Sequence, residues 1–384
     1  MQDVIHRRVR VQSDRVHHRI LPTPHGAQRI GTLSVINLPP RPQDAGLYHG
    51  RHLAPMLDRI YGEFMRRFYR LKRLTPDAMR AQSQHWLAEL PHHIQIEIDA
   101  MAAGAARPTA ELADLLYADI AIPGDTGAPD GPMCSAMVTQ LHGASWVARN
   151  TDWYPPLLLR GCEAVVHNTP NRIPVIALGI RGDIDVDTGA NAEGLWIHAH
   201  TMHAKQLPPS GKPRISWLFW LREALETCAS LDDLEAMLTS VERDRGIILV
   251  ALDSTSGDAA VFECGVDTHT RIEPDGPHLL ATNHPAARHP TDPQRLARSQ
   301  PSSTTARLQG LKDICQHHPP EVGPDDLIDT LASDTVEMRS PPTLRTIYSA
   351  VAAPAKRECW FASGTPDGSP AASTGEWLRV PWPI

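Results

Sequence analysis

A single cysteine stands where a Pro/Gly-rich stretch of this sequence gives way to a regular one. Residues 131–155 read GPMCSAMVTQLHGASWVARNTDWYP and contain Cys134, Arg149 and Asp152. The two apolar runs in this segment predict neighbouring antiparallel strands, which would bring the three side chains into one neighbourhood. A guanidinium group near a thiol favours the thiolate, the nucleophilic form of cysteine. The segment therefore indicates a cysteine nucleophile that Arg149 activates.

The peptide bond before Cys134 offers this cysteine a base of its own. If the bond between Met133 and Cys134 is cut, the new α-amino group has a pKa of about 7.7–8.0 and can accept the thiol proton. Asp152 would then hold that amine in place. The alternative interpretation is structural, because a cysteine at a strand start is usually an inert buried thiol. An arginine and an aspartate three residues apart are likewise usually a surface ion pair.

Asn283 is a second candidate for catalysis, and it lies in the run HLLATNHP (278–285). An amide group at the end of a strand can donate a hydrogen bond to the oxyanion of a tetrahedral intermediate. Loss of one such donor typically costs about 10²–10³ in rate. Without Cys134, the same asparagine would be interpreted as an ordinary turn residue before His-Pro.

Two further groups of residues admit a functional interpretation. His198, His200 and His203 have a spacing that zinc ligands on a strand can have, but no carboxylate or cysteine cluster accompanies them, so no metal site is predicted. Trp153 follows Asp152 directly and is placed to wall an apolar acyl pocket. The sequence contains no GxGxxG, P-loop, GxSxG or HExxH motif. Nucleotide-binding, serine-hydrolase and zincin functions are therefore without support, and no cofactor is expected.

The elements that must position these residues change character at Cys134. Apolar residues recur at three- and four-residue spacing in 51–71, 94–105 and 110–120, which predicts amphipathic helices. Residues 123–133 hold three Pro and three Gly and interrupt this pattern. Strands are predicted at 134–141, 145–150, 163–168, 174–180, 194–200, 246–253, 258–265 and 278–283, helices at 215–227, 231–243 and 304–317, and a closing hairpin at 345–352 and 357–363. This order suits an α+β architecture in which helices cover antiparallel sheets.

The composition bounds the class of protein. The 384 residues include 41% hydrophobic residues and carry a formal net charge of -7, which gives no basic field for nucleic acid. The exception is the segment 1–30, a basic arm that we interpret as a mobile or partner-facing tail. The sequence has no apolar stretch of the roughly 20 residues that span a membrane, and its charged start differs from a secretory signal, so a cytoplasmic location is expected. The six cysteines are scattered singly, which predicts free thiols.

The segment 131–155 resembles the processing site of N-terminal-nucleophile (Ntn) hydrolases. The resemblance is to the acid ceramidase, N-acylethanolamine amidase, choloylglycine hydrolase and isopenicillin N acyltransferase type, and it is greatest to bacterial acyltransferase-like members of the C45 peptidase family. In these proteins a cysteine follows a self-cleaved bond. A strand rich in small and apolar residues then leads to an R-N-x-D turn, which residues 149–152 match.

Other segments extend the resemblance to roughly residues 30–366. The run at 188–201 resembles the family's G-x-N-x-x-G-L turn and contains Asn191, and 278–285 resembles the strand that ends in the oxyanion asparagine, here Asn283. The run SSTTARLQGL (302–311) resembles a helix start that carries a catalytic arginine, here Arg307. The family commonly has an asparagine where this sequence has Thr201. The resemblance implies that Asn191 and Thr201, with Trp153, contact the substrate.

The resemblance also implies a fold and an activity. The fold would be a four-layer αββα sandwich, with the arm 1–30, a helix-rich pro-region or α-subunit at 31–133, and a catalytic β-subunit at 134–384 that stays beside it. The activity would be hydrolysis of an amide bond in a small N-acyl compound, or of an acyl thioester, through an acyl-enzyme on Cys134. An acyltransferase that moves an acyl group to an amine in secondary metabolism is the first alternative, and a non-catalytic binding protein on the same fold is the second. The acyl group, the amine and the oligomeric state, including a homo-oligomer, stay open.

Overall fold

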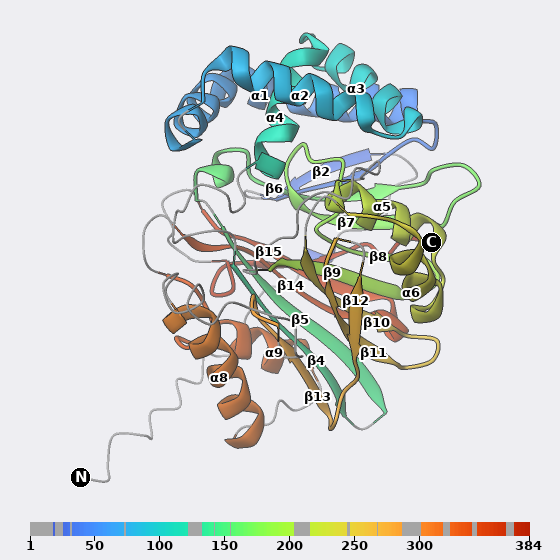
Figure 1. The fold of residues 1–384 in the computed structure, drawn as a ribbon, viewed down its shortest axis with the longest axis vertical. Helices are drawn as coiled ribbons and strands as arrows, with labels where there is room; N and C mark the ends of the chain where they lie inside the picture. Colours follow the sequence, from blue (N-terminus) through green and yellow to red (C-terminus); the bar gives the residue numbers. More distant parts are fainter. Residues whose placement is uncertain are drawn as a thin grey trace.

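Two β-sheets lie face to face at the centre of the molecule, and helices lie on the outer side of each sheet (Figure 1). This computed structural model describes residues 18–19, 26–30, 33–72, 74–121, 133–141, 143–153, 155–202, 216–243, 246–266, 268–285, 301–317, 323–339, 344–365 and 372–384. The layers run helix, sheet, sheet, helix, so the predicted α+β class is confirmed. The Pro/Gly-rich segment before Met133 and the predicted zinc-ligand candidate His203 lie outside the described residues.

The first sheet carries the predicted Cys134 hairpin. Its seven strands lie in the order β1 (His18–Arg19), β16 (Trp377–Val380), β15 (Glu358–Ser363), β14 (Arg345–Ala353), β5 (Ala144–Trp153), β4 (Met133–Leu141) and β13 (His278–Ala281). The strands β4 and β5 pair antiparallel, with Cys134 opposite Thr151 and Met133 opposite Asp152. The predicted hairpin is therefore confirmed, and it sets the thiol and the Asp152 carboxyl on neighbouring strands.

The second sheet combines strands from before and after Cys134. Its nine strands lie in the order β12 (His269–Ile272), β11 (Ala259–Cys264), β10 (Ile247–Asp253), β9 (Leu195–Thr201), β8 (Thr188–Asn191), β7 (Val175–Ile180), β6 (Cys162–His167), β3 (Leu33–Asn37) and β2 (Gly26–Ile30). Every position of β10 is buried, which accounts for its apolar sequence IILVALD. Because β3 pairs in parallel with β6, the predicted α-subunit shares a sheet with the predicted β-subunit.

Helices pack on both sheets. The elements are α1 (Pro42–Lys72), α2 (Pro76–Glu89), α3 (His92–Gly104), α4 (Thr109–Ala121), α5 (Trp217–Thr227), α6 (Leu231–Ser240), α8 (Pro301–His317) and α9 (Pro324–Leu331), with short 3₁₀ turns at Pro155–Leu159 and Pro354–Lys356. The helices α1 to α4 lie together beyond the β2–β6 end of the second sheet (Figure 1). The helix α5 packs on β8 and β9, and α6 on β10. On the first sheet, α9 packs on β5 and β14, while α8 packs on β4 and β13, next to the strand that carries Cys134.

Several elements were not predicted from the sequence: β2, β3, β8, β12, β16, α2 and α9. The helix α2 buries only Met79, Ser83 and Trp86, so its apolar periodicity is weak. The helix predicted at 304–317 is present as α8, which begins three residues earlier, at Pro301. Residues 286–300 lie outside the described part of the chain.

The basic arm predicted over 1–30 is only partly a tail. Gly26–Ile30 forms β2 at one edge of the second sheet, and His18–Arg19 pairs with β16 at one edge of the first. Backbone hydrogen bonds make both pairings, and exposed edge strands need no apolar alternation. The interpretation of the whole segment as a mobile tail is therefore wrong for these residues.

Buried ion pairs join α1 and α3 to the remainder of the fold. Arg222 of α5 contacts Glu97 of α3 over 2.7 Å and Glu226 over 3.2 Å. His49 of α1 contacts Glu163 of β6 over 2.6 Å. All five side chains are at most 3% exposed. Removing one partner of such a pair leaves an uncompensated buried charge, so these contacts hold the helical layer in place.

Replacing Arg222 with methionine should lower the free energy of unfolding by about 3–5 kcal/mol, because Glu97 and Glu226 lose their shared buried cation. Chemical denaturation measures the change. The matched control is Arg67→Met, which removes a pair with Glu63 whose side chains are 44% and 43% exposed. That control should change the stability by less than about 1 kcal/mol. Equal effects of the two variants would show that the buried pair does not hold the layers together.

Candidate active site

Cys134 lies at the start of β4, in the apolar space between the two sheets. Its side chain is 3% exposed, and its Sγ atom is 4.0 Å from the carbonyl oxygen of Ala199 on β9. The β-sheet pairing sets this depth, because β4 lies between β5 and β13. All six cysteines are free thiols, as their scattered positions in the sequence predicted.

Arg149 of β5 connects the thiol to the second sheet. Its Nη2 atom donates to Cys134 Sγ over 3.4 Å, to Asp187 Oδ2 over 2.9 Å and to the carbonyl oxygen of Ala199 over 2.8 Å. Its Nη1 atom donates to the carbonyl oxygen of Asp187 over 2.7 Å and to Thr188 Oγ1. The guanidinium is fully buried, so these contacts fix its position beside the sulfur.

Burial dominates the acidity of the Cys134 thiol. The low-polarity surroundings raise its pKa to about 11, although Arg149 acts in the opposite direction. A thiol with this pKa is protonated at neutral pH. Arg149 lowers the pKa of the thiol, in the direction expected from the sequence, but in the uncut chain desolvation outweighs this neighbouring charge. The thiol needs a base to become a nucleophile.

Asn283 and Arg307 hold the backbone atoms of Cys134. The Cys134 amide N–H donates to Asn283 Oδ1 over 2.6 Å, and Arg307 Nη2 donates to the same oxygen over 3.1 Å. Arg307 Nη1 donates to the carbonyl oxygen of Cys134 over 2.5 Å and to Ser135 Oγ over 2.7 Å. Asn283 Nδ2 donates to the carbonyl oxygen of Thr201 over 2.9 Å. Both side chains are at most 3% exposed, so they form a rigid frame around the cysteine backbone.

Asp152 lies beside this frame and contacts it through Arg307. Its Oδ1 atom accepts a hydrogen bond from Thr346 Oγ1 over 2.6 Å, and its Oδ2 atom is 3.3 Å from Arg307 Nη1. The contact to the Cys134 nitrogen predicted for Asp152 is instead made by Asn283. Burial raises the pKa of Asp152 to about 6, against the opposing charge of Arg307.

If the chain cuts itself before Cys134, as the sequence predicts, the rate of that cut should have an inflection near pH 6 and fall by up to about tenfold per pH unit below it. Protonated Asp152 no longer attracts Arg307, which holds the Cys134 carbonyl. Protonation of Asp152 does not itself unfold the protein, because a carboxyl whose pKa is raised in the folded state stabilises the fold at low pH. Electrophoresis of precursor refolded at each pH measures the rate. The Asp152→Asn variant should lack the inflection, and an unchanged inflection would assign it to another group.

The three predicted substrate contacts have different surroundings. Trp153 is 8% exposed and lines a pocket between the sheets, next to Asp187 and Tyr348. Thr201 lies at the end of β9, where its carbonyl oxygen contacts Asn283. The side chain of Asn191, however, forms its hydrogen bonds with residues at the end of α5.

Asn191 binds the carboxyl end of a helix. Its Nδ2 atom donates to the carbonyl oxygens of Leu225 and Cys228 over 2.9 and 2.7 Å, and its Oδ1 atom accepts from the Leu195 N–H over 3.0 Å. These bonds fasten the β8–β9 turn to α5, on the helix-covered face of the sheet. The interpretation of Asn191 as a substrate contact is corrected to a structural role.

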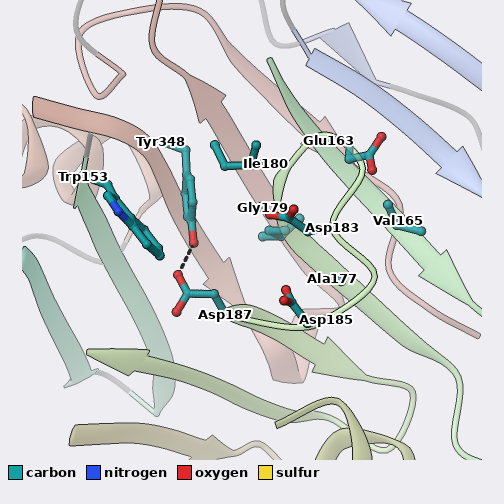
Figure 2. A pocket seen from close by; sticks show the side chains of 11 residues that line it. Trp153, Glu163, Val165, Ala177, Gly179, Ile180, Asp183, Asp185, Asp187 and Tyr348 are labelled. Atoms are coloured by element: carbon teal, nitrogen blue, oxygen red, sulfur yellow. Dashed lines mark hydrogen bonds between the residues drawn. The ribbon is translucent and has the colours of Figure 1, made fainter. Parts of the chain in front are cut away.

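The pocket beside Trp153 is lined by both carboxylates and apolar or aromatic side chains (Figure 2). Its empty volume is about 380 Å³, part of it open to solvent. The lining residues are Trp153, Glu163, Val165, Ala177, Leu178, Gly179, Ile180, Asp183, Asp185, Asp187 and Tyr348. Tyr348 donates from its hydroxyl to Asp187 Oδ2 over 2.6 Å, the same oxygen that accepts from Arg149. The pocket is thus separated from the thiol by one guanidinium group.

Two groups of described residues have a spacing that metal ligands can have: the pair His198 and His200, and a cluster that contains His93. His198 and His200 stack with their rings 5.2 Å apart, and burial lowers the pKa of each well below its usual value, so both are neutral. His93, Glu223 and Glu226 have metal-like spacing. Arg172 lies 2.7 Å from Glu223 and 3.4 Å from Glu226, which makes the group an ion-pair network.

Sequence reasoning missed several residues of the site. Asp187 and Tyr348 orient Arg149, Thr346 bonds Asp152, and the Thr304 hydroxyl accepts from the backbone N–H of Asn283 over 3.0 Å. The one available signal was the run DIDVD at 183–187, whose alternation would put three carboxylates on one side if the segment were extended. The other residues are single polar positions in apolar strands, with no local pattern.

A comparison with protein families then identifies the chain. The sequence model of the acyl-coenzyme A:6-aminopenicillanic acid acyl-transferase family matches residues 139–368, more than half of the chain. The chain belongs to this family. The match confirms the resemblance to the isopenicillin N acyltransferase type, and its span includes Arg149, Asp152, Asn283 and Arg307. It begins after Cys134. Membership makes the protein an enzyme of amide hydrolysis or acyl transfer.

The chain is also similar to several solved structures. A variant of conjugated bile acid hydrolase from Clostridium perfringens has 11% identity and a TM-score of 0.41, over 60% of this chain and 89% of that one. An N-acylethanolamine-hydrolyzing acid amidase ortholog from Caenorhabditis elegans has 13% identity and a TM-score of 0.41, over 65% and 100%. Penicillin V acylase from Agrobacterium tumefaciens has 17% identity and a TM-score of 0.40, over 60% and 83%. No curated protein sequence matches the chain. Within the described residues no helix has the length and apolar character to cross a bilayer.

Proposed function

We propose that this family member is a self-cleaving cysteine amidase. Its backbone is cut between Met133 and Cys134, and the freed Cys134 hydrolyses an amide bond of a small N-acyl compound through an acyl-enzyme. The residues 31–133 and 134–384 then form the α- and β-subunits. The strand pairing of β3 with β6 and the buried ion pairs described above support their staying together after the cut.

One observation carries this proposal: three atoms of Cys134 are each held by a different buried polar side chain. Asn283 accepts from the nitrogen, Arg307 donates to the carbonyl oxygen and Arg149 donates to the sulfur. Burying such polar groups costs free energy unless they are bonded, and an inert cysteine in a core needs none of them. The arrangement therefore favours a reacting residue over a structural thiol.

Self-cleavage in this mechanism begins with attack of Cys134 Sγ on the carbonyl carbon of Met133. The C–N bond breaks, and the nitrogen of Cys134 takes up the thiol proton. A thioester and a free α-amino group result, and water then hydrolyses the thioester. The contact of Asn283 Oδ1 with the nitrogen favours keeping the new amine beside the thiol.

During turnover the new amine can act as the base that the Cys134 thiol needs because of its high pKa. The pKa of the amine is about 7.7–8.0, so at neutral pH it can take the thiol proton that Arg149 alone cannot remove. The Cys134 sulfur attacks the substrate carbonyl, the leaving amine receives the proton, and water releases the acid. We assign oxyanion stabilisation to the Asn283 amide and a backbone N–H. Asp152 positions the frame through Arg307.

Terminal sequencing and intact-mass analysis test the proposal together. Purified active protein should contain two chains, and the second should begin at Cys134. Incubation with simple N-acyl amides and acyl thioesters should then add the mass of the acyl group to that second chain. A single uncut chain that no acyl compound modifies would contradict the proposal and favour a binding protein on the same fold.

Acyl transfer is the second candidate, because the family is named for transfer from an acyl thioester to an amine. Hydrolysis and transfer share the acyl-enzyme and differ in whether water or an amine takes the acyl group. Turnover with and without an added amine separates them. Formation of a new amide at modest amine concentration would make transfer the main activity.

A further inference from the structure

The segment between β7 and β8 directs three carboxylates into the pocket. Asp183, Asp185 and Asp187 alternate with Ile184 and Val186, which are buried at 0% and 1% exposure. The segment is a loop that bends at Asp185 and Asp187, and its two apolar side chains are buried while its carboxylates line the pocket. The two apolar residues therefore anchor the segment in the core, and the three aspartates line the pocket together (Figure 2).

Only the outer two of these aspartates have cationic partners. Arg160 Nη2 contacts Asp183 Oδ1, and Arg149 Nη2 contacts Asp187 Oδ2 over 2.9 Å. Asp185 is 9% exposed and has no hydrogen-bond or ion-pair partner among the residues that the structure describes. Figure 2 shows its side chain among the residues that line the pocket, below that of Asp183 and beside that of Asp187. A buried carboxylate without a partner is costly, so this group is suited to a ligand that donates hydrogen bonds.

A second carboxylate oxygen of the same pocket is also without a bond. Glu163 Oε1 accepts from His49 Nε2 over 2.6 Å and from the Gly182 N–H over 2.7 Å. Glu163 Oε2 is buried and has no hydrogen-bond partner among the described residues. The pocket thus offers acceptors on two elements, β6 and the segment before β8.

We propose that this pocket binds a primary ammonium group of the substrate, so that the preferred substrate is an N-acyl compound with an amine on a short alkyl chain, such as a mono-N-acyl diamine. The inference rests on the proposed amidase function and names its substrate class. An ammonium group is a compact cation with three donors, which suits carboxylates that converge from different directions. Burial and the charges of Asp183 and Asp187 raise the pKa of Asp185 well above its usual value. A bound ammonium group would lower this pKa again, because a neighbouring positive charge favours the ionised carboxylate.

The remaining lining favours an alkyl stem. Val165, Ala177 and Ile180 lie beside the carboxylates, and apolar side chains of this kind pack on the methylene groups of a long amine. Trp153 and Tyr348 add aromatic faces, which attract cations. The pocket is therefore amphipathic, as an alkylammonium is.

The position of the pocket suits a substrate that reaches Cys134. Asp187 Oδ2 accepts from Arg149 Nη2 over 2.9 Å, and the same nitrogen donates to Cys134 Sγ over 3.4 Å. A cation beside Asp187 therefore lies one guanidinium group away from the nucleophile, and the alkyl chain of the substrate would have to span that separation to place the amide at Cys134. Chain length is a direct test of this placement.

Paired substrates test the inference. N-butanoyl-1,4-diaminobutane and N-butanoylpentylamine have the same shape, but the first ends in an ammonium and the second in a methyl group. The first should have the higher kcat/KM by about 10- to 100-fold. The Asp185→Asn variant should bring this ratio close to one, whereas Asp275→Asn, which removes an exposed carboxylate, should keep it. An unchanged ratio in folded Asp185→Asn would overturn the inference.

Direct binding separates this inference from the amidase proposal. Butylammonium should bind the uncut Cys134→Ala chain at least about tenfold more tightly than butanol in calorimetry, with no need for catalysis. Adding Asp185→Asn should remove the difference. Equal binding of the two probes to the Cys134→Ala chain would overturn the ammonium site even if acyl-enzyme forms. Failure of every acyl compound to modify Cys134 would instead reject the amidase function, and the binding result would still decide the pocket.

Discussion

The Cys134→Ala variant is expected to remain one uncut chain of 384 residues and to lose amide turnover by a factor of about 10⁴–10⁶. Removal of the thiol removes both the group that attacks Met133 and the group that would carry the acyl chain. Intact-mass analysis measures the cut, and product formation measures turnover. The fold should persist, because alanine fits the small buried position at the start of β4.

The matched control for this prediction is Cys359→Ala on β15. Cys359 is fully buried, and burial alone accounts for the raised pKa of its thiol. This variant should be cut and active like the unaltered protein, apart from a modest loss of stability. Cleavage of Cys134→Ala at the same bond would mean that a contaminating protease makes the cut, and the self-cleavage mechanism would lose its basis.

Replacing Asn283 with alanine should reduce amide turnover by about 10²–10³. The variant loses the oxygen that holds the Cys134 nitrogen and the amide group that contacts the Thr201 carbonyl. Steady-state kinetics on processed enzyme measures the loss, and denaturation checks the fold. A change of less than about threefold would show that Asn283 takes no part in the chemistry.

The Asn283→Asp variant separates the two roles of this side chain. Aspartate keeps an oxygen for the Cys134 nitrogen but cannot donate to an oxyanion or to the Thr201 carbonyl. If holding the amine is the main role, Asn283→Asp should retain clearly more turnover than Asn283→Ala. If oxyanion stabilisation dominates, the two variants should be equally impaired.

The local sequence pattern was sufficient to predict the β4–β5 hairpin and most of the polar residues that lie near Cys134 on it. The strands β4 and β5 alternate and are adjacent along the chain, so their pairing follows from a short connection. The positions of Arg149 and Asp152 near Cys134 therefore follow from the amino-acid sequence alone. Arg307 and Asn283 are more than a hundred residues away. Only the family resemblance indicated Arg307, whereas Asn283 was also a candidate because of its place at the end of a predicted strand.

Contacts between distant segments explain the errors. Asn191 lies in a turn that resembles the family's pattern, yet its side chain fastens α5, which comes more than thirty residues later. Asp152 was expected to hold the amine of Cys134 after the cut; in the uncut chain Asn283 contacts the nitrogen, and Asp152 contacts Arg307 instead. Which polar atoms meet depends on how the two sheets and α8 pack, and that packing has no local sequence signal.

The sequence by itself determined the secondary structure around Cys134, the α+β class and the family, because each depends on residue order within short segments. The tertiary structure alone decided that the thiol is too deeply buried for Arg149 to ionise it, and that Asp185 lies in a pocket without a partner. Both results depend on desolvation. The cost of desolvation depends on what surrounds a group in space, and residues from many parts of the chain provide those surroundings.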